Sequence, residues 1–541
     1  MIEFEITVHD LPDEEIDNWE FAYDYHYLYI LGNGKDVYIG ETNDVITRTK
    51  QHFYPSDSCY PYKFNRIYVI TCREFEETRA KHYEALLIKL MFADNKFHIT
   101  NLDKSRKRIH YERKNEFELG FDRLWVQLGT LGLVNHRTFQ AVINSDRYKY
   151  SPYTILTQEQ TNALNSILNI LTTQENKPHK KRYLHRPILI EGDAGTGKTV
   201  VATTLFYYLK SHPDFGKMKI GMVYANTATR YEVEQLFKSI PGVYAKDIIK
   251  PIDVTKEKYD ILICDEAHRL RRKKNLGLYS SSFSAANERM GLDNSHDELD
   301  WLLRNTDCLI LFYDRKQIVS ACDISYQDFF ARLMDKYRGI RPVELNSQMR
   351  IRAGDRYVPY IFDLLEQNPT SALEFDNYDF QLFSSLQDMV MQLQDKEKTF
   401  GLCRMCSGYA WQWSSKKDAS VPDITIDGVD IWWNKQRKGW IENEAAKNDM
   451  GSIYAIPGLD LNYAGVVIGP DVYYDRADHT IKVDRKHFFD HKVKDAVSDE
   501  ELKRFVLNTY AHFLTRGICG TYVYICDDAL REYLSQFIPI V

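Results

Sequence analysis

The segment at residues 188–199 restricts the possible folds of this chain more than any other stretch. Its first three residues are apolar and predict a buried strand, and the apolar spacing at 200–209 predicts a helix. The residues between them fit the phosphate-loop pattern at every fixed position: Gly192, Asp193, Ala194, Gly195, Thr196, Gly197, Lys198 and Thr199. Glycines let backbone N–H groups curl around phosphate oxygens, and the helix N-terminus adds a positive dipole. The segment therefore predicts an α/β core that binds a nucleoside triphosphate.

Side chains in and after this loop have expected roles. Lys198 is expected to reach the β- and γ-phosphates, and the Thr199 hydroxyl to ligate Mg²⁺. Farther along, the apolar strand expected at 259–264 ends in Asp265 and Glu266. Two acids after a strand are common, but downstream of a phosphate loop they predict a Mg²⁺ ligand at Asp265. Glu266 would then orient or deprotonate the attacking water. ATP and Mg²⁺ are the expected cofactors.

Length and composition limit the class of protein. The chain has 541 residues, more than one hydrophobic core usually holds, so two to four domains are expected. Hydrophobic residues at 44% and charged residues at 27% are typical of soluble globular proteins. No apolar run is long enough to span a bilayer and the N-terminus is acidic, so we expect a cytoplasmic location and no membrane partner. The net charge of −7 does not exclude nucleic-acid binding, which depends on local patches such as the basic run at 104–108.

The N-terminal region predicts a small α/β unit. Strands are expected at 25–31, 37–40 and 66–71, the first two joined by an Asn-Gly hairpin. A helix opened by Thr42 or Asn43 is expected to run to about residue 53, with Arg48 and His52 on one face. In a longer helix at 74–92, Glu84 falls within the apolar stripe. A carboxylate there is costly unless it is paired or binds a cation, and a salt bridge to a lysine would explain this residue alone.

Taken together, these residues resemble the GIY-YIG nuclease family over roughly residues 21–113. The first triplet reads Tyr-Leu-Tyr rather than Gly-Ile-Tyr, and Glu41 stands where some relatives have lysine. The resemblance is carried by an ordered set of six polar positions: Tyr29, Tyr38, Arg48, His52, Glu84 and Asn101.

The resemblance implies a role for each of the six. Glu84 would hold one divalent ion, Mg²⁺ or Mn²⁺, because hard oxygen ligands suit such ions. Arg48 would clamp the scissile phosphate through its fork. Tyr29, Tyr38 and His52 would position or deprotonate water, with the identity of the base left open, and Asn101 would brace the site.

The remainder of the chain resembles the Schlafen group 3-like DNA/RNA helicase family, a superfamily 1 motor, from about residue 152 to the C-terminus. Gln160 resembles the helicase glutamine that reads adenine, although an ordinary helix N-terminus would also explain it. Gln317 matches the glutamine that senses the γ-phosphate, and Arg350 and Arg516 match the two arginine fingers. Segments at 225–228, 453–469 and 508–510 resemble other helicase motifs, with Pro457 where relatives are expected to have glutamine.

The domain organisation expected is a GIY-YIG domain at 21–115, a linking and packing segment at 116–150, and RecA-like lobes at 151–370 and 371–541. The function expected is an ATP-dependent translocase or helicase fused to a metal-dependent endonuclease. By analogy, it would act against foreign (phage) DNA in a prokaryotic defence or restriction-like system. The alternative is a regulatory ATPase that gates the nuclease without moving along nucleic acid. A degenerate scaffold is disfavoured by the intact site residues. DNA is a more expected partner than RNA, and a homo-oligomer or a defence-system partner protein is left open.

Overall fold

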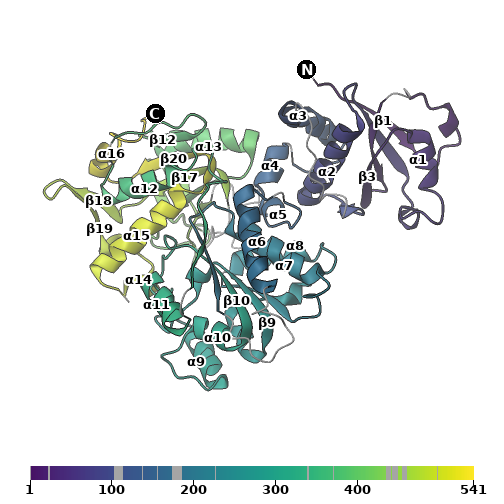
Figure 1. The fold of residues 1–541 in the computed structure, drawn as a ribbon. Helices are drawn as coiled ribbons and strands as arrows, with labels where there is room; N and C mark the ends of the chain where they lie inside the picture. The colour runs from purple at the N-terminus through teal and green to yellow at the C-terminus, as the bar shows by residue number, and fades with distance from the viewer. Residues whose placement is uncertain are drawn as a thin grey trace. The chain divides into compact units, whose positions relative to one another are not determined.

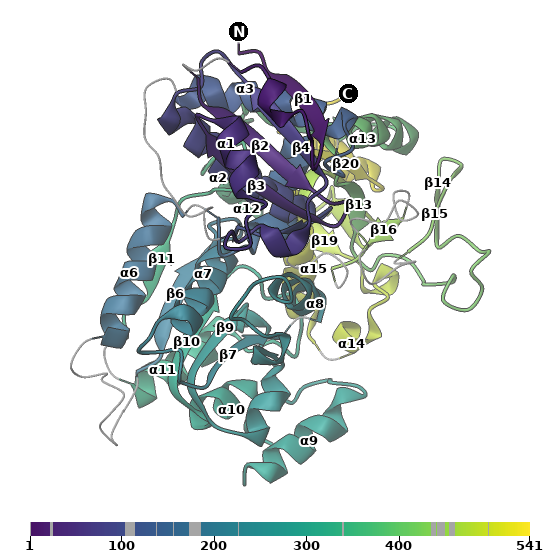
Figure 2. The same cartoon turned by 90° about the vertical axis from the view of Figure 1, so that its right-hand side faces the viewer.

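The computed structural model describes residues 2–21, 25–102, 114–136, 138–154, 156–172, 186–225, 227–337, 340–369, 371–433, 440, 449–453, 460–495 and 497–541. The chain divides into two compact units, Met1–Thr154 and Ile155–Val541 (Figures 1 and 2). The basic run at 104–108, Asn226 and the segment at 454–459 that contains Pro457 lie outside the described residues. No helix in the described part of the chain combines the length and apolar composition needed to cross a membrane.

The N-terminal unit is built on a five-stranded sheet of order β1-β4-β2-β3-β5. All its pairs are antiparallel except β3 with β5. The strands are β1 (Glu5–Asp10), β2 (Tyr27–Gly32), β3 (Asp36–Thr42), β4 (Arg66–Thr71) and β5 (His98–Ile99). The helices are α1 (Val45–Gln51), α2 (Glu77–Asp94), α3 (Lys114–Thr130), α4 (Phe139–Asn144) and α5 (Asp146–Lys149).

The structure differs from the sequence expectations for this unit in three respects. Helix α1 begins at Val45, because the Asp44 carboxylate rather than Thr42 or Asn43 accepts the Thr47 N–H. The sheet gains an edge strand, β1, which precedes the expected domain start at residue 21. The segment expected to link and pack two domains forms α3 to α5, and Asn135 and His136 donate their backbone N–H groups to Asp94 at the end of α2. These helices therefore belong to the N-terminal unit.

The second unit contains two parallel sheets. The first has the order β11-β6-β10-β9-β7-β8. Its strands are β6 (Ile188–Gly192), β7 (Ile220–Tyr224), β8 (Ile248–Ile249), β9 (Tyr259–Asp265), β10 (Thr306–Tyr313) and β11 (Val343–Leu345). The helices of this half are α6 (Gln158–Thr172), α7 (Lys198–Ser211), α8 (Thr227–Phe237), α9 (Tyr279–Arg289), α10 (Glu298–Arg304) and α11 (Tyr326–Lys336). Parallel strands place their carboxyl ends at one edge, where the phosphate loop follows β6.

The second sheet has the order β12-β20-β17-β13-β16 and is also parallel. Its strands are β12 (Asp379–Phe383), β13 (Cys403–Ser407), β16 (Met450–Gly451), β17 (Leu461–Ile468) and β20 (Gly517–Ile525). Two hairpins, β14 (Ile424–Ile426) with β15 (Val429–Ile431) and β18 (Val472–Asp475) with β19 (Thr480–Val483), accompany it. The helices are α12 (Tyr357–Glu366), α13 (Leu386–Phe400), α14 (His491–Lys494), α15 (Asp499–Leu514) and α16 (Asp528–Leu534).

Helix α12 belongs to the second half of this unit, although a lobe boundary was expected at residue 370. Its buried side chains, among them Tyr357, Ile361 and Leu364, join one apolar cluster with Val506 and others from α15. The boundary between the halves therefore falls in the segment between β11 and α12.

Candidate functional site

The phosphate loop lies between β6 and α7, as predicted. Gly195 and Gly197 have φ values of +88° and +87°, a left-handed conformation that favours glycine. A Cβ atom at Gly197 would lie 2.1 Å from the Gln160 amide nitrogen, so the loop has no room for a side chain there. The Gln160 amide is hydrogen-bonded at both ends, because Nε2 donates to Thr196 O at 3.3 Å and Oε1 accepts from Thr157 N at 3.0 Å. Gln160 braces the loop in this structure, and its reading of adenine stays a prediction.

Lys198 is held by protein acceptors at the start of α7. Its Nζ donates to Gly192 O at 2.7 Å, to Asp193 O at 2.9 Å and to Asp314 Oδ2 at 3.0 Å. Burial favours a higher pKa for Asp314, but the Lys198 ammonium outweighs it and the pKa lies below the usual value. Gln317, the predicted γ-phosphate sensor, donates to the same Asp314 oxygen at 2.6 Å. Asp314 was not among the predicted site residues, although an acid directly after the apolar strand β10 could have indicated it.

Asp265 and Glu266 follow β9, and their carboxylates are buried. Both oxygens of Asp265 and Oε2 of Glu266 have no hydrogen-bond partner among the described residues. Burial, and then the charge of Glu266, raises the pKa of Asp265 to about 7, while the Thr199 hydroxyl acts in the opposite direction. A buried carboxylate without a partner is costly, and a divalent cation would remove that cost. The donor set therefore fits Mg²⁺, with Asp265 and Thr199 as the residues that would hold it.

The two predicted arginine fingers meet at one carboxylate. Arg350 Nη1 lies 2.5 Å from Asp460 Oδ1, and Arg516 Nη1 lies 3.6 Å from the same oxygen. Arg516 Nε also donates to His512 Nε2 at 3.0 Å. Burial and the Arg516 guanidinium lower the pKa of His512 well below its ordinary value, so the imidazole is a neutral acceptor. Neither Asp460 nor His512 was singled out from the sequence, because no local pattern marks them.

The segment that carries Arg350 is attached to the phosphate loop. Gln348 Nε2 donates to Ala194 O at 2.8 Å, and Met349 N donates to Gly195 O at 3.0 Å. These two hydrogen bonds join the residues directly before Arg350 to the phosphate loop.

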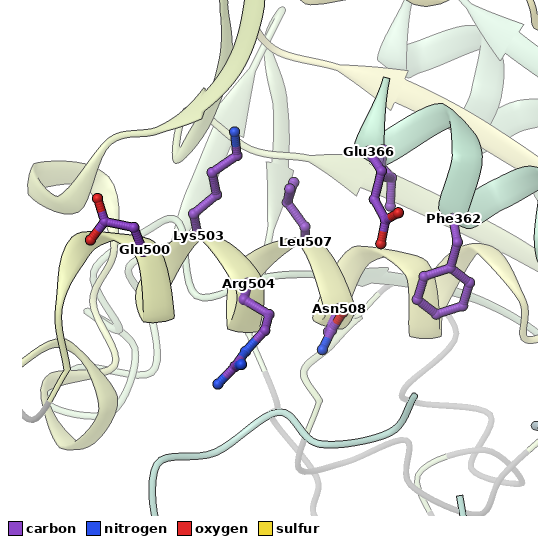
Figure 3. A pocket seen from close by; sticks show the side chains of 8 residues that line it. Phe362, Glu366, Glu500, Lys503, Arg504, Leu507 and Asn508 are labelled. Carbon is purple, nitrogen blue, oxygen red and sulfur yellow. The ribbon is translucent and has the colours of Figure 1, made fainter. Parts of the chain in front are cut away.

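A groove of about 220 Å³ lies between α12 and α15, and Figure 3 shows its lining side chains. Asn508, one of these residues, donates to Ile318 O at 3.1 Å, and Ile318 directly follows Gln317, the predicted γ-phosphate sensor. Helix α15 is thus hydrogen-bonded to the chain that leaves β10. The predicted motif at Asn508 contacts the first half of the unit.

In the N-terminal unit the structure brings four predicted residues together. Tyr29 OH lies 2.9 Å from His52 Nε2, and Arg48 Nε donates to Tyr29 OH at 3.4 Å. The Tyr38 ring lies beside both, with centroids 5.1 Å from His52 and 6.1 Å from Tyr29. Burial, with the nearby Tyr38, raises the pKa of Tyr29 well above its usual value, so the hydroxyl keeps its proton and donates to His52. We call Tyr29, Tyr38, Arg48 and His52 the tyrosine cluster.

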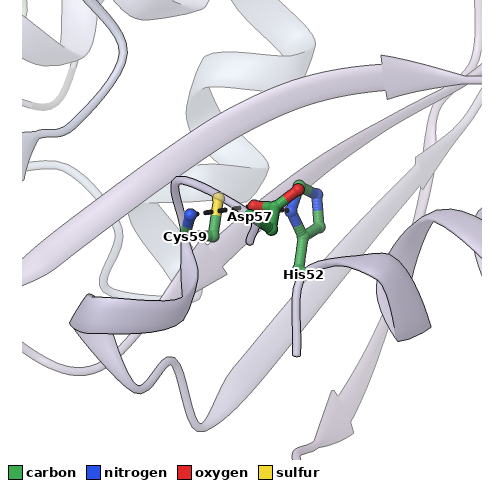
Figure 4. Close-up of side chains that lie close together, drawn as sticks. All are labelled: His52, Asp57 and Cys59. Atoms are coloured by element: carbon green, nitrogen blue, oxygen red, sulfur yellow. Dashed lines mark hydrogen bonds and ion pairs between the residues drawn. The ribbon is translucent and has the colours of Figure 1, made fainter. Parts of the chain in front are cut away.

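Asp57 holds the other side of His52, and the sequence analysis missed it. Asp57 Oδ1 lies 3.0 Å from His52 Nδ1, and its Oδ2 lies 3.7 Å from Arg48 Nη1. Figure 4 shows Asp57 between His52 and Cys59, the one group of three possible metal ligands found within 4.8 Å of each other in the described residues. Burial and the adjacent carboxylate raise the pKa of the Cys59 thiol to about 12. Asp57 accepts hydrogen bonds from His52 Nδ1 and Cys59 N, and these bonds account for its position.

The last two predicted nuclease residues lie on other elements. Asn101 exchanges hydrogen bonds with the backbone of Ile39, donating to its O at 2.6 Å and accepting from its N at 3.4 Å, which braces β3 as expected. Glu84 is buried in α2, a helix that packs chiefly against β3 within the sheet. It forms no group with two further acidic, histidine or cysteine ligands in the described part of the chain. The role of Glu84 as a metal ligand stays a prediction.

Comparison with known proteins gives the family of the second unit. Residues 185–527 match the family described as Schlafen group 3, DNA/RNA helicase domain. The uncharacterized protein YPL245W of Saccharomyces cerevisiae is 26% identical over 439 residues, which cover 70% of this chain and 93% of that protein. Distant solved structures include the arterivirus nonstructural protein 10 helicase (12% identity, 64% of this chain and 61% of that one, TM-score 0.29). Another is Mss116p bound to ssRNA and AMP-PNP, with 12% identity and a TM-score of 0.30; the match covers 70% of this chain and 75% of that one. The family match covers more than half of the sequence and begins after the N-terminal unit, and the chain belongs to the Schlafen group 3 DNA/RNA helicase domain family.

Proposed function

We propose that this protein is an ATP-dependent nucleic-acid translocase or helicase, built on two RecA-like lobes, joined to a metal-dependent GIY-YIG endonuclease. The observation that carries the motor half is the buried, partnerless Asp265 carboxylate. It belongs to one site with a phosphate loop and two arginines that converge on Asp460. Acceptors for a metal and cations for a triphosphate are the two things that ATP hydrolysis requires.

In this proposal each side chain acts on ATP from its own element. Lys198 would leave Asp314 to contact the phosphates, and Asp265 and Thr199 would hold a metal ion, which would supply charge neutralisation for phosphoryl transfer. Glu266 orients the attacking water. Arg350 and Arg516 meet the charge that develops on the γ-phosphate. Because Asn508 and Arg516 lie on or next to α15, closure around ATP shifts the second half of the unit, and repeated closure drives movement along a strand.

The nuclease half of the proposal rests on the tyrosine cluster. Tyr29 OH donates a hydrogen bond to His52 Nε2, so a proton acceptor stands beside the hydroxyl. Arg48 adjoins both groups and has a planar fork that suits a phosphate. Glu84 would hold Mg²⁺ or Mn²⁺, which would neutralise charge on the scissile phosphate. The proposed substrate is foreign DNA met in the cytoplasm, and this part of the proposal rests on analogy with defence systems.

The test is incubation of the purified protein with single- and double-stranded DNA and RNA, with and without ATP and Mg²⁺. We expect DNA-stimulated ATP hydrolysis, strand displacement and DNA cleavage. Lys198→Ala should abolish ATP turnover, and Glu84→Ala should abolish cleavage while ATP turnover continues. Stimulated hydrolysis without displacement or tracking would replace the motor with a regulatory ATPase that gates the nuclease. Cleavage that persists in Glu84→Ala would refute the nuclease assignment.

A further inference from the structure

Asp460 has a place in the structure that the proposed chemistry does not require. It lies just before β17, is nearly buried, and faces two arginines that come from distant parts of the chain. Arg350 lies in the segment that follows β11 of the first sheet, and Arg516 directly precedes β20 of the second. Oδ1 of Asp460 accepts a hydrogen bond from Arg350 Nη1 and forms a longer ion pair, at 3.6 Å, with Arg516 Nη1.

Arg350 still has hydrogen-bond donors without partners in the described part of the chain while its Nη1 is bound to Asp460. Its Nε and Nη2 are buried and have no hydrogen-bond partner within the described residues. Buried donors without acceptors are costly, so this arrangement is poised for a further anion. Arg516 is steadied from its other side by neutral His512, which adds no opposing charge.

Lys198 is likewise held by a carboxylate on the first sheet. Its ammonium is paired with the buried Asp314 carboxylate, 3.0 Å away. All three cations expected to meet phosphate oxygens are therefore paired with aspartates of the protein.

We propose that Asp460 is a positioning residue that holds Arg350 and Arg516 together in the nucleotide-free protein and releases them to the γ-phosphate of a bound nucleoside triphosphate. The inference rests on the proposed ATPase function. The exchange replaces one charge-assisted contact with another, so triphosphate binding must break the Asp460 contacts first. A diphosphate has no γ-phosphate and leaves these contacts intact. Asp460 thereby makes the site discriminate less strongly between triphosphate and diphosphate than the arginines alone would.

The test measures the affinities of a non-hydrolysable ATP analogue and of ADP for the full chain, by calorimetry in the presence of Mg²⁺. Asp460→Asn should tighten binding of the triphosphate analogue about tenfold, the equivalent of one charge-assisted hydrogen bond, and leave ADP binding unchanged. Asp460→Glu keeps the acceptor and should retain the wild-type ratio of the two affinities. In an Arg350→Ala, Arg516→Ala background, Asp460→Asn should no longer tighten triphosphate binding.

Asp471→Asn is the matched control. Asp471 is also a buried carboxylate of the second half, but it accepts from Tyr510 OH at 2.7 Å, and its replacement should not change the affinity ratio. Equal changes in both affinities for Asp460→Asn would overturn the inference, because Asp460 would then act on a part of the nucleotide that both ligands share. No change in either affinity would overturn it as well. If Asp460→Asn fails to fold, Asp460→Ser, which also removes the carboxylate, takes its place with the same expected and overturning results. If the wild-type protein binds neither nucleotide, the proposed ATPase function itself fails.

Discussion

Replacing Gly40 by alanine should disable the tyrosine cluster without touching the motor. Gly40 lies on β3, opposite Tyr29 on β2, and a Cβ atom there would lie 2.4 Å from the Tyr29 ring and hydroxyl. The ring cannot stay in place at that distance. Overpacking costs about 1–3 kcal/mol, and loss of the Tyr29–His52 hydrogen bond adds about 1 kcal/mol. The N-terminal unit should therefore lose about 2–4 kcal/mol of stability.

The assay is cleavage of labelled DNA, with ATP turnover of the same preparation as an internal standard. If the cluster supplies the proton acceptor, displacement of Tyr29 should slow cleavage by about 10²–10⁴-fold, the usual contribution of general acid–base catalysis. ATP turnover should be unchanged. Gly32→Ala is the matched control, because a Cβ atom at Gly32 on the same strand as Tyr29 would meet only Val37 Cγ1 at an ordinary 3.8 Å.

Normal cleavage by Gly40→Ala would refute this reasoning, since the substitution cannot leave Tyr29 where the structure has it. Equal losses in Gly40→Ala and Gly32→Ala would point to general damage of the sheet and would refute it too. Hydrogen exchange of β2 and β3 would locate the disturbance in either case.

Other substitutions test other parts of the structure. Arg516→Ala should bind ATP yet hydrolyse it about a thousandfold more slowly in single-turnover measurements, and normal hydrolysis would demote Arg516 to a structural residue. Asp57→Ala removes the acceptor for His52 Nδ1 and should slow cleavage; a buried donor without a partner costs about 1–3 kcal/mol, which a lower melting temperature would report. Burial raises the pKa of Glu298 to about 7. Its unfolded value is about 4.3, so the folded state binds more protons between these values and stability falls as pH rises through them. Glu298→Gln should therefore melt higher than the wild type at pH 8 and no higher at pH 4, and an unchanged difference across that range would contradict the shift.

Local patterns predicted the catalytic framework well. The phosphate loop, the strand ending in Asp265, and the strand at 66–71 are encoded by neighbouring residues, and the structure has them where expected. The tyrosine cluster also assembles from the residues predicted for it.

The carboxylates that hold the cationic side chains could not be predicted in this way. Lys198 and Asp314 are 116 residues apart, and Arg350 and Asp460 are 110 residues apart. Hydrophobic periodicity in the sequence does not predict these ion pairs, because they depend on the tertiary arrangement of the sheets and loops. The lobe boundary was misplaced for a related reason: α12 is amphipathic, and its sequence alone does not tell which core it enters.

Strand β1 determines where the N-terminal unit should be cut for expression as a separate fragment. It pairs with β4 over six residues, from Glu5 opposite Thr71 to Asp10 opposite Arg66. Just ahead of it, the Ile2 and Phe4 carbonyls accept from Arg123 and Gln127 of α3. A recombinant fragment cut at residue 21 would bare the β4 backbone along its whole length, and such edges recruit other copies. A fragment spanning residues 1–154 would keep β4 paired with β1 along its whole length.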